Sequence, residues 1–357
     1  MTATTKTLLV MAGGTGGHVY PAMAVADYLQ AKGWNIVWLC TVGGMENRLL
    51  INKNYQKTMM TMRGVRGKGL MGWLLLPIKL SLALAQAYSA IAKFKPNLVL
   101  GMGGFAAFPG GLMAYVMRKP LLIHEQNSVA GLTNKTLSYF ACRVLSAFPA
   151  AFGDKATLVG NPVRAEITQV PRPEVRMQTR SGPLRLLVVG GSLGAQALNQ
   201  VLPIALAKIA VSQRPQVVHQ AGEKHIVALK AHYQEMGVKA QAMAYIEDMA
   251  AMYDWADLVI CRAGALTIAE LSAAGVASVL VPFPHAVDDH QTSNASYLAE
   301  AGAAILVSQT TFTVDKLAGL IGNLSREQCL SMAIKARALG KPEATASVAN
   351  ICMELAA

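Results

Sequence analysis

A pattern of strand, glycine turn and helix occurs twice in the chain and constrains the fold more than any other feature. The first copy reads L-L-V-M-A-G-G-T-G-G-H-V-Y-P over residues 8–21, and the second reads L-L-V-V-G-G-S-L-G over residues 186–194. In each copy an apolar run ends in glycines, and an amphipathic helical pattern follows. The repeat predicts two similar α/β halves, each built on a parallel sheet covered by helices on both faces.

Each glycine turn is a candidate anion site, because N–H groups at the start of a helix lie at the positive end of its dipole. The spacing excludes two common nucleotide motifs. A P-loop needs Lys directly after Gly17, and a dinucleotide fingerprint needs a third glycine where Val19 stands. A tight turn that requires positive φ explains a single glycine cluster equally well, so both interpretations stay open here.

Short apolar strands alternate with helical patterns through both halves. Predicted strands cover residues 7–11, 35–40, 98–100, 121–124, 216–219, 242–246, 257–261 and 279–282, and predicted helices cover residues 21–31, 80–94, 110–117 and 266–274. Four prolines within residues 161–183 indicate a domain boundary. Parallel strands end at one edge of a sheet, so we expect one cleft to collect the residues that follow them: His18, Gly103, Glu125, Asn127, Ser192, Ile246, Gly264 and His285.

Composition narrows the class of protein. The 357 residues are 53% apolar, which is enough for two domains with cores of their own. Five scattered cysteines without a C-x-x-C pair speak against a disulfide framework or a zinc site and suit a reducing cytosol. The N-terminal residues do not read as a signal peptide. Residues 285–291 contain two His and two Asp, but their spacing matches no compact metal site, so we expect a polar loop and no metal.

Positive charge is concentrated in one segment. Between Glu46 and Glu125 there is no acidic residue, whereas eleven Lys and Arg residues account for most of the net charge of +12. Such an asymmetric field indicates an anionic partner, either a nucleic acid or a membrane surface. The segment has few aromatic residues for base stacking and no known reader motif, so we expect no nucleic-acid binding.

The hydrophobicity of residues 69–92 favours a membrane surface. Pro77 and Lys79 interrupt the apolar run, so it cannot span a bilayer. A basic, apolar stretch with Trp73 near its start is typical of an element that lies on an anionic membrane. We expect residues 69–76 to be exposed and residues 80–94 to form a buried helix.

Two local patterns carry candidate chemistry. Thr267 to Glu270 fits a helix capping box; alternatively, the Glu270 carboxylate binds ribose hydroxyls while the N–H groups of Ala265 and Leu266 meet a diphosphate. His18 directly follows the first glycine turn, where an imidazole can act as a general base. Glu125 is the alternative base.

Seven motifs recur in a characteristic order: G-G-T-G-G-H-V-Y-P-A (13–22), G-M-G-G-F-x-x-x-P-G (101–110), H-E-Q-N (124–127) with G-L-T-N-K (131–135), G-N-P-V-R (160–164), G-G-S-L-G-A (190–195), C-R-A-G-A-L-T-x-x-E (261–270) and P-F-P-H-A-x-D-D-H-Q (282–291). In this order they resemble the bacterial peptidoglycan N-acetylglucosaminyltransferases. That family adds GlcNAc to undecaprenyl-pyrophosphoryl-MurNAc-pentapeptide (lipid I) and so forms lipid II.

The resemblance implies the glycosyltransferase B fold, with two Rossmann-like domains. Residues 1–163, together with a C-terminal helix within residues 341–357 that crosses back, would form an acceptor-binding and membrane-facing domain. Residues 164–340 would form the domain that binds UDP-GlcNAc.

The resemblance also implies roles for particular residues. The uracil would meet Ile246, with Arg164 close by, and the ribose would meet Glu270. The remaining donor-binding positions would be Thr15, Gly16, Gly17, Asn127, Ser192, Ala265, Leu266, Thr267, Ile268, Ala269 and Gln291. The pyrophosphate of the acceptor would face Gly13, Gly14, Gly103 and Gly104.

The implied reaction is a single displacement that inverts the donor's α linkage to β. The 4-hydroxyl of MurNAc attacks C1 of GlcNAc, with His18 or Glu125 as base and no cofactor. The implied setting is the cytoplasmic face of the bacterial inner membrane, in cell-wall synthesis, cell shape and cell division, with other cell-wall synthesis proteins as further partners. Two alternatives are a UDP-GlcNAc 2-epimerase of the same fold and a non-enzymatic membrane scaffold that binds a nucleotide sugar.

Overall fold

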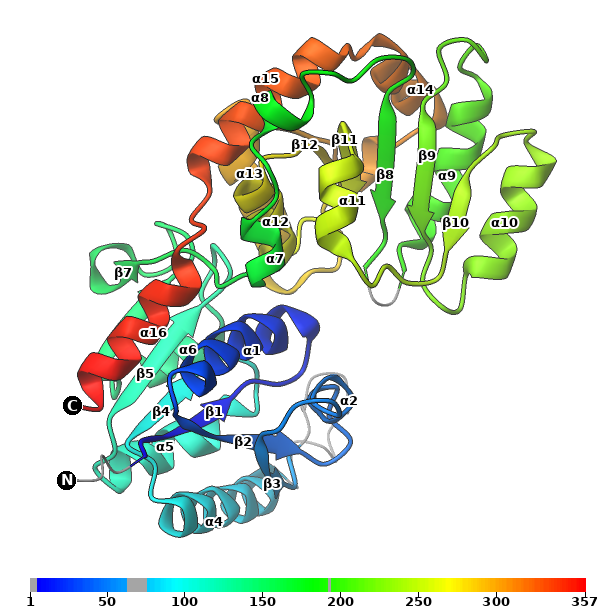
Figure 1. The fold of residues 1–357 in the computed structure, drawn as a ribbon. Helices are drawn as coiled ribbons and strands as arrows, with labels where there is room; N and C mark the ends of the chain where they lie inside the picture. Colours follow the sequence, from blue (N-terminus) through cyan, green and yellow to red (C-terminus); the bar gives the residue numbers. More distant parts are fainter. Residues whose placement is uncertain (1–4, 63–75, 192–193) are drawn as a thin grey trace. The chain divides into compact units, whose positions relative to one another are not determined.

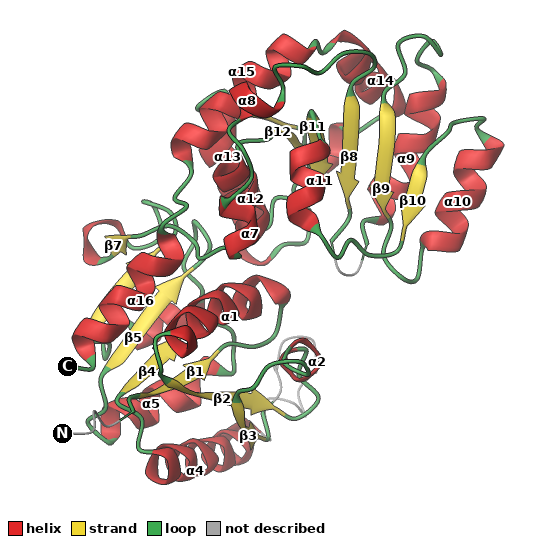
Figure 2. Cartoon of the chain, viewed as in Figure 1, coloured by secondary structure: helices red, strands yellow, loops and turns green. Residues whose placement is uncertain are grey.

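The computed structural model describes residues 5–62, 76–191 and 194–357. The chain divides into two compact units, Met1–Arg164 with Pro342–Ala357 and Ala165–Lys341 (Figure 1). Each unit is a parallel sheet with helices on both faces (Figure 2). The predicted α/β class with two similar halves is therefore confirmed.

The first unit contains a seven-stranded parallel sheet in the order β3-β2-β1-β4-β5-β6-β7. The strands are β1 (Thr7–Met11), β2 (Asn35–Thr41), β3 (Gln56–Met60), β4 (Leu98–Gly101), β5 (Leu121–Glu125), β6 (Arg143–Ser146) and β7 (Thr157–Leu158). The helices are α1 (Gly16–Ala31), α2 (Glu46–Leu49), α4 (Leu76–Phe94), α5 (Ala107–Val116), α6 (Leu132–Leu137), α16 (Ala344–Leu355) and the 3₁₀ helix η1 (Gly153–Lys155).

Alternate residues of β1 serve the two faces of this sheet, as the two-residue period of a strand requires. Leu8 and Val10 belong to the core beneath α1 and α16, whereas Leu9 and Met11 belong to the core beneath α4 and α5. Burial on both faces explains why the central strands are continuous apolar runs rather than alternating ones.

The second unit contains a six-stranded parallel sheet in the order β10-β9-β8-β11-β12-β13. The strands are β8 (Arg185–Val189), β9 (Gln216–Gln220), β10 (Gln241–Met243), β11 (Leu258–Cys261), β12 (Ala277–Leu280) and β13 (Ala304–Leu306). The helices are α7 (Ala165–Thr168), α8 (Pro173–Arg176), α9 (Gln196–Ala207), α10 (Ile226–Glu235), α11 (Met249–Trp255), α12 (Ala265–Ala274), α13 (His290–Ala299), α14 (Val314–Asn323) and α15 (Arg326–Leu339), with 3₁₀ helices η2 (Val287–Asp289) and η3 (Gln309–Thr311).

The two sheets share one topology. In each, the third, second, first, fourth and fifth strands of the unit are neighbours in that order, as in Rossmann folds. Successive strands are added on one side of β1 and then, from β4 onward, on its other side. In the second unit the same change occurs between β8 and β11. The repeated glycine turns follow β1 and β8, so each lies at the switch point of its sheet, where such folds bind ligands.

The C-terminal helix α16 belongs to the first unit and packs against α1 (Figure 1). The Thr345 hydroxyl donates a hydrogen bond to the carbonyl of Val163 at 3.0 Å, and Val348 and Cys352 are buried in the core with β1. The crossing helix expected from the resemblance is therefore present.

Four strands at or next to the sheet edges, β3, β6, β7 and β13, were not predicted from the sequence, whereas the edge strand β10 was. Strand β3, for example, reads Q-K-T-M-M and is mostly exposed, so it lacks the apolar run that marks a central strand. Helix α1 begins at Gly16 rather than at residue 21, so the glycine turn itself forms its first turn.

Helix α4 corrects the prediction of a buried helix over residues 80–94. One side of α4 packs Ala83, Ala87 and Ile91 into the core, whereas Leu82 is 48% and Tyr88 52% exposed. The helix is amphipathic because it covers the sheet from outside. Residues 69–75, most of the stretch expected to be exposed, lie outside the described residues. No described helix combines the length and apolarity needed to cross a bilayer.

A buried histidine connects α9 to β9 in the second unit. The Asn199 amide nitrogen donates to the carbonyl of Ala221 at 3.2 Å, so its oxygen faces His219, whose Nε2–H donates to it at 3.0 Å. The other nitrogen of His219 accepts from the Tyr233 hydroxyl at 2.8 Å. Burial lowers the pKa of His219 to about 3, so the ring is neutral at pH 7.

The neutral state of His219 predicts loss of stability in acid. Since its folded pKa is below the unfolded value of about 6.5, its contribution is full above pH 6.5 and falls as the pH decreases toward 3. Acidification from pH 7 to pH 5 should remove about 2 kcal/mol through this residue. Urea denaturation should show a weaker pH dependence in His219→Gln, which keeps polar groups but does not titrate. Equal pH dependence in both proteins would contradict the assignment.

Candidate functional site

Two glycine turns of the first unit meet at the switch point of its sheet. One joins β1 to α1, with Gly14 at φ +90°, and the other follows β4, with Gly103 at +86° and Gly104 at +79°. A Cβ on Gly104 would lie 2.5 Å from the carbonyl oxygen of Gly13. The turns can approach this closely only because glycine occupies both the positive φ and the contact.

The His18 ring lies against the second of these turns. His18 stands in the first turn of α1, and a Cβ on Gly103 would lie 3.2 Å from its Nδ1 and Cε1 atoms. Thr15 is the N-cap of α1 and makes no side-chain cap bond, so the N–H groups of Gly16 and Gly17 point out of the helix beside the ring. The structure therefore brings Thr15, Gly16, Gly17, His18, Gly103 and Gly104 together; their roles stay predictions.

Two polar residues at the end of β5, His124 and Gln126, form a hydrogen-bonded chain with His18. The His18 Nδ1 atom is 2.8 Å from Oε1 of Gln126, and Nε2 of Gln126 donates to Nδ1 and to the carbonyl oxygen of His124, each at 3.1 Å. The other nitrogen of His124 donates to the carbonyl of Gly160 at 2.8 Å. Complete burial lowers the pKa of His124 to about 4, so this ring is neutral at pH 7.

Glu125, between these two residues, faces a different set of groups. One carboxylate oxygen accepts from the backbone and side-chain amides of Asn127 at 3.0 and 3.2 Å. The other accepts from the Gly131 N–H at 3.1 Å and from Asn134 at 2.9 Å. With four N–H donors and 2% exposure, this carboxylate holds the loop that contains Asn127 and is poorly placed to accept a substrate proton.

The glycine turn after β8 is held by Gln220 at the end of β9. The Gln220 side chain accepts from the N–H and donates to the carbonyl of Gly191, both at 3.0 Å. A Cβ on Gly194 would lie 2.2 Å from the carbonyl oxygen of Ala221, so this position also requires glycine. Ser192, the predicted diphosphate contact in this turn, lies outside the described residues.

Helix α12 begins one residue before the predicted start, and this corrects the capping-box interpretation. Gly264 is the N-cap, no side chain caps the helix, and Ala265 is the first helical residue. Thr267 is therefore the third residue of the helix, and Glu270 lies in its second turn. The Glu270 carboxylate accepts from the Tyr253 hydroxyl at 3.1 Å. The uncapped first turn leaves the N–H groups of residues 265–267 directed at the carboxyl edge of the sheet.

The remaining predicted contacts stand on loops or helix starts. Ile246 is buried after β10, and Gln291, in the first turn of α13, accepts from the Phe283 N–H at 2.9 Å. Arg164 ends the first unit, with its guanidinium 5.8 Å from the ring centre of Tyr20. Their roles toward a donor stay predictions. Among the described residues, no group of three or more His, Cys, Asp or Glu is arranged to hold a metal ion.

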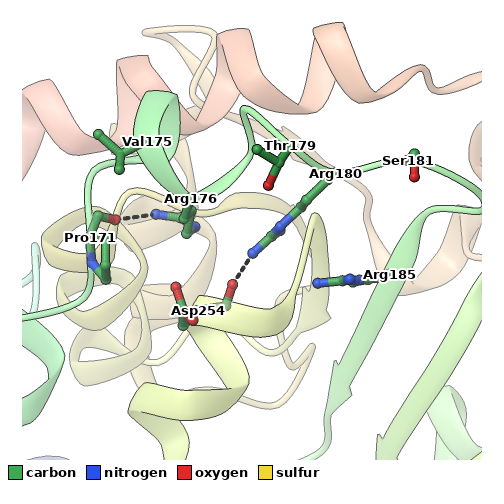
Figure 3. Close-up of a pocket in the computed structure, with 8 residues that line it drawn as sticks. All are labelled: Pro171, Val175, Arg176, Thr179, Arg180, Ser181, Arg185 and Asp254. Carbon is green, nitrogen blue, oxygen red and sulfur yellow. Dashed lines mark hydrogen bonds between the residues drawn. The ribbon is translucent and has the colours of Figure 1, made fainter.

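A cavity of about 410 Å³ lies in the second unit, beside the start of β8. Figure 3 shows Arg176, Arg180 and Arg185 turned toward the space around Asp254. Arg176 donates to the carbonyls of Ala274 and Gly275, and Arg180 to those of Asp254 and Ala256. These arginines thus satisfy carbonyls at the ends of α11 and α12. The cavity contains none of the predicted site residues.

Sequence reasoning missed four side chains that shape these sites: His124, Gln126, Gln220 and Tyr253. The motif H-E-Q-N contains the first two, and the two-residue period of a strand end places 124 and 126 on one side and 125 on the other. This strand period could have indicated that His124 and Gln126 lie side by side. Gln220 and Tyr253 carry no local signal, because their partners Gly191 and Glu270 are distant in sequence.

Two Rossmann-type units, each with a glycine turn at its switch point, are the architecture of the glycosyltransferase B fold. Residues 8–146 match the glycosyltransferase family 28 N-terminal domain, and residues 185–349 match the family 28 C-terminal domain. The crystal structure of Acinetobacter baumannii MurG superposes with a TM-score of 0.86, at 42% identity over 98% of this chain and 99% of that one. The calicheamicin glycosyltransferase CalG4, at 15% identity and a TM-score of 0.66 over 99% of this chain and 98% of that one, shares the fold.

Curated relatives indicate which group of glycosyltransferases the chain resembles. Proteins of Dechloromonas aromatica (56% identical over 98% of this chain and 99% of that protein) and Thiobacillus denitrificans (54% over the full length of both) are similar to this chain. Both are named UDP-N-acetylglucosamine–N-acetylmuramyl-(pentapeptide) pyrophosphoryl-undecaprenol N-acetylglucosamine transferase. The chain belongs to this family of glycosyltransferases.

The contact between the glycine turns predicts a selective effect of Gly104→Ala. The substitution places Cβ against the Gly13 carbonyl at φ +79° and should lower the free energy of unfolding by about 3 kcal/mol or more. Gly33→Ala is the matched control, because φ is +84° but nothing lies within 4 Å; it should cost about 1 kcal/mol. Equal losses in urea denaturation would show that the close approach of the turns is unimportant.

Proposed function

We propose that this chain transfers GlcNAc from UDP-GlcNAc to the 4-hydroxyl of MurNAc in lipid I, forming the β-1,4-linked lipid II precursor of peptidoglycan. The full-length similarity to relatives that carry this activity in their names supports the proposal. The observation that carries it furthest is the arrangement of His18 beside two glycine turns in the unit expected to bind the acceptor.

The reaction needs a base at the acceptor hydroxyl and stabilisation of the departing UDP. His18 is the base: its Nδ1 atom faces Gln126, so Nε2 is the nitrogen left for the proton of the 4-hydroxyl. Oxygen O4 then bonds to C1 of GlcNAc as the bond from C1 to the diphosphate oxygen breaks. Glu125 is the weaker candidate, because four N–H donors already occupy its oxygens.

The donor binds chiefly to the second unit. The first turn of α12 and the glycine turn after β8 surround the diphosphate, with Ser192, Ala265, Leu266, Thr267, Ile268 and Ala269 as its contacts. The Glu270 carboxylate, oriented by Tyr253, binds the ribose hydroxyls, and the backbone at Ile246 binds uracil with Arg164 nearby. Gln291 and Asn127 bind the sugar, and Thr15, Gly16 and Gly17 complete the donor site. N–H groups and the helix dipole stabilise the charge that develops on UDP.

The acceptor binds to the first unit. Its pyrophosphate faces the turns that contain Gly13, Gly14, Gly103 and Gly104, where the backbone is bare of side chains and the start of α1 favours an anion. The lipid chain leads from there to a membrane.

A basic, apolar patch on α4, α5 and α6 supports attachment to an anionic phospholipid surface. These helices are in contact in that order on the side of the sheet beneath which Leu9 and Met11 are buried. Exposed apolar side chains of the patch are Ile78, Leu82, Tyr88, Tyr115, Val116, Leu132 and Tyr139. Basic residues on and beside these helices are Lys79, Lys93, Arg118, Lys119 and Lys135. A surface of this composition fits the cytoplasmic leaflet of the inner membrane.

Turnover with UDP-GlcNAc and a short-chain lipid I analogue tests the function. UDP and the disaccharide product should appear one-for-one, and only when both substrates are present. An epimerase would convert UDP-GlcNAc without an acceptor, and a scaffold would release no UDP. Either result would overturn the transferase assignment for this chain.

The same assay tests the base. His18→Ala should lower kcat about 100-fold or more, because general-base catalysis typically contributes a factor of that size, while UDP-GlcNAc still binds. His232→Ala, on α10 of the second unit, is the matched control and should keep full turnover. Near-normal kcat in His18→Ala would exclude His18 as base without touching the transferase assignment.

Vesicle binding tests the patch. The double variant Ile78→Ser, Leu82→Ser should bind vesicles that contain phosphatidylglycerol at least ~10-fold more weakly, because it removes two exposed aliphatic groups. Val227→Ser, at an 80% exposed position of the second unit, should bind as the wild type does. Co-sedimentation at two salt concentrations separates the apolar contribution to vesicle binding from the electrostatic one. Unchanged binding of the double variant would contradict the location of the patch.

A further inference from the structure

Behind His18 lies a chain of hydrogen bonds that ends at a backbone carbonyl. It runs from His18 through Gln126 and His124 to Gly160, and both middle residues are buried, at 1% and 0% exposure. Each bond in this chain has one possible direction, because the carbonyl at the inner end can only accept and each group then determines the role of the next. The chain can therefore be read from the inside outward.

The carbonyl of Gly160 determines the tautomer of His124. A carbonyl oxygen only accepts, so the Nε2 atom of His124 carries the hydrogen that is donated to it at 2.8 Å. Burial keeps the ring neutral at pH 7. Its Nδ1 atom is then a bare acceptor that faces Gln126.

His124 in turn determines the orientation of the Gln126 amide. The amide nitrogen of Gln126 lies 3.1 Å from both Nδ1 and the carbonyl oxygen of His124, and both atoms are acceptors. A flipped amide would place an oxygen against two acceptors in a buried site, which is costly. The Gln126 oxygen is therefore held toward His18.

An amide oxygen only accepts, so the partner atom of His18 at 2.8 Å must carry a hydrogen. We propose that Gln126 is a positioning residue that holds neutral His18 in the tautomer protonated at Nδ1, so that Nε2 presents its lone pair to the acceptor hydroxyl. This inference rests on the proposed role of His18 as base. It gives a positioning role to His124 and Gln126, which take no part in the bond changes of the reaction.

The chain orients the base but carries no proton inward. When the 4-hydroxyl gives its proton to Nε2, His18 becomes an imidazolium whose Nδ1–H stays bonded to Gln126. The Gln126 amide has no site for another proton, and His124 is buried and neutral. The proton therefore leaves from Nε2 after UDP has departed, and His18 returns to the same tautomer.

Nitrogen-15 NMR of the histidine-labelled full-length protein tests the tautomer directly. Comparison with His18→Ala assigns the His18 signals among the seven histidines. At a pH where His18 is neutral, we expect a protonated Nδ1 and an unprotonated Nε2. A wild-type His18 that carries its proton on Nε2 would overturn the proposal, whatever any variant does.

Two variants test whether Gln126 is the cause. Gln126→Met keeps the length of the side chain but removes the acceptor; we expect mixed His18 tautomers and kcat lowered about 10- to 100-fold, as for other groups that orient a functional histidine, with unchanged affinity for UDP-GlcNAc. Gln126→Glu keeps an oxygen toward His18 but turns its second oxygen toward the acceptors of His124, so we expect a less stable protein that retains the Nδ1–H signature and more turnover than Gln126→Met. An unchanged tautomer and kcat in Gln126→Met would overturn the proposal.

The outcomes separate this proposal from the one on which it rests. If His18→Ala keeps turnover, the role of His18 as base fails, whereas the tautomer spectra still show whether Gln126 orients the ring. If His18→Ala is inactive and Gln126→Met is unaffected in both readouts, only the role of Gln126 fails. Should Gln126→Met not fold, the wild-type spectrum and Gln126→Glu decide the matter.

Discussion

The candidate acceptor site depends on one steric constraint, the contact of two glycine turns at the switch point of the first sheet. Gly104 approaches the Gly13 carbonyl so closely that a single Cβ would collide with it, and Gly103 leaves just enough room for the His18 ring. The N–H groups at the start of α1 can then lie next to an imidazole. Bulkier residues would separate the turns and remove both the candidate anion site and the space that the His18 ring occupies.

In both units a buried neutral histidine is hydrogen-bonded to an amide side chain. His124 directs Gln126 in the first unit, and His219 faces the oxygen of Asn199 in the second. In each case a backbone carbonyl fixes one end of the network, at Gly160 and at Ala221, and burial lowers the pKa of the histidine far below neutral pH. A buried network with every direction determined is rigid, because any flipped amide leaves acceptors facing one another.

The first unit combines two surfaces that a lipid-linked acceptor requires. The glycine turns lie at the carboxyl edge of the sheet, and the patch on α4, α5 and α6 covers one of its faces. In the proposed function, the edge binds the pyrophosphate and the sugar while the face rests on the membrane. One face of α4 packs into the core through Ala83 and Ala87. The opposite face is exposed and carries Ile78 and Leu82.

The sequence alone determined the α/β class, the two halves and the positions of the glycine turns, because apolar runs and glycine clusters are local signals. It also placed His18 directly after the first glycine turn. Tertiary structure decided that Glu125 holds a loop, that Gly264 rather than Thr267 begins α12, that α4 is half exposed, and that Gln126 faces His18. These depend on partners that no local pattern reveals: His18 and Gln126 are 108 residues apart, and His124 and Gly160 are 36 apart. Which way a buried amide points is a property of the atoms around it, and only the folded chain brings those atoms together.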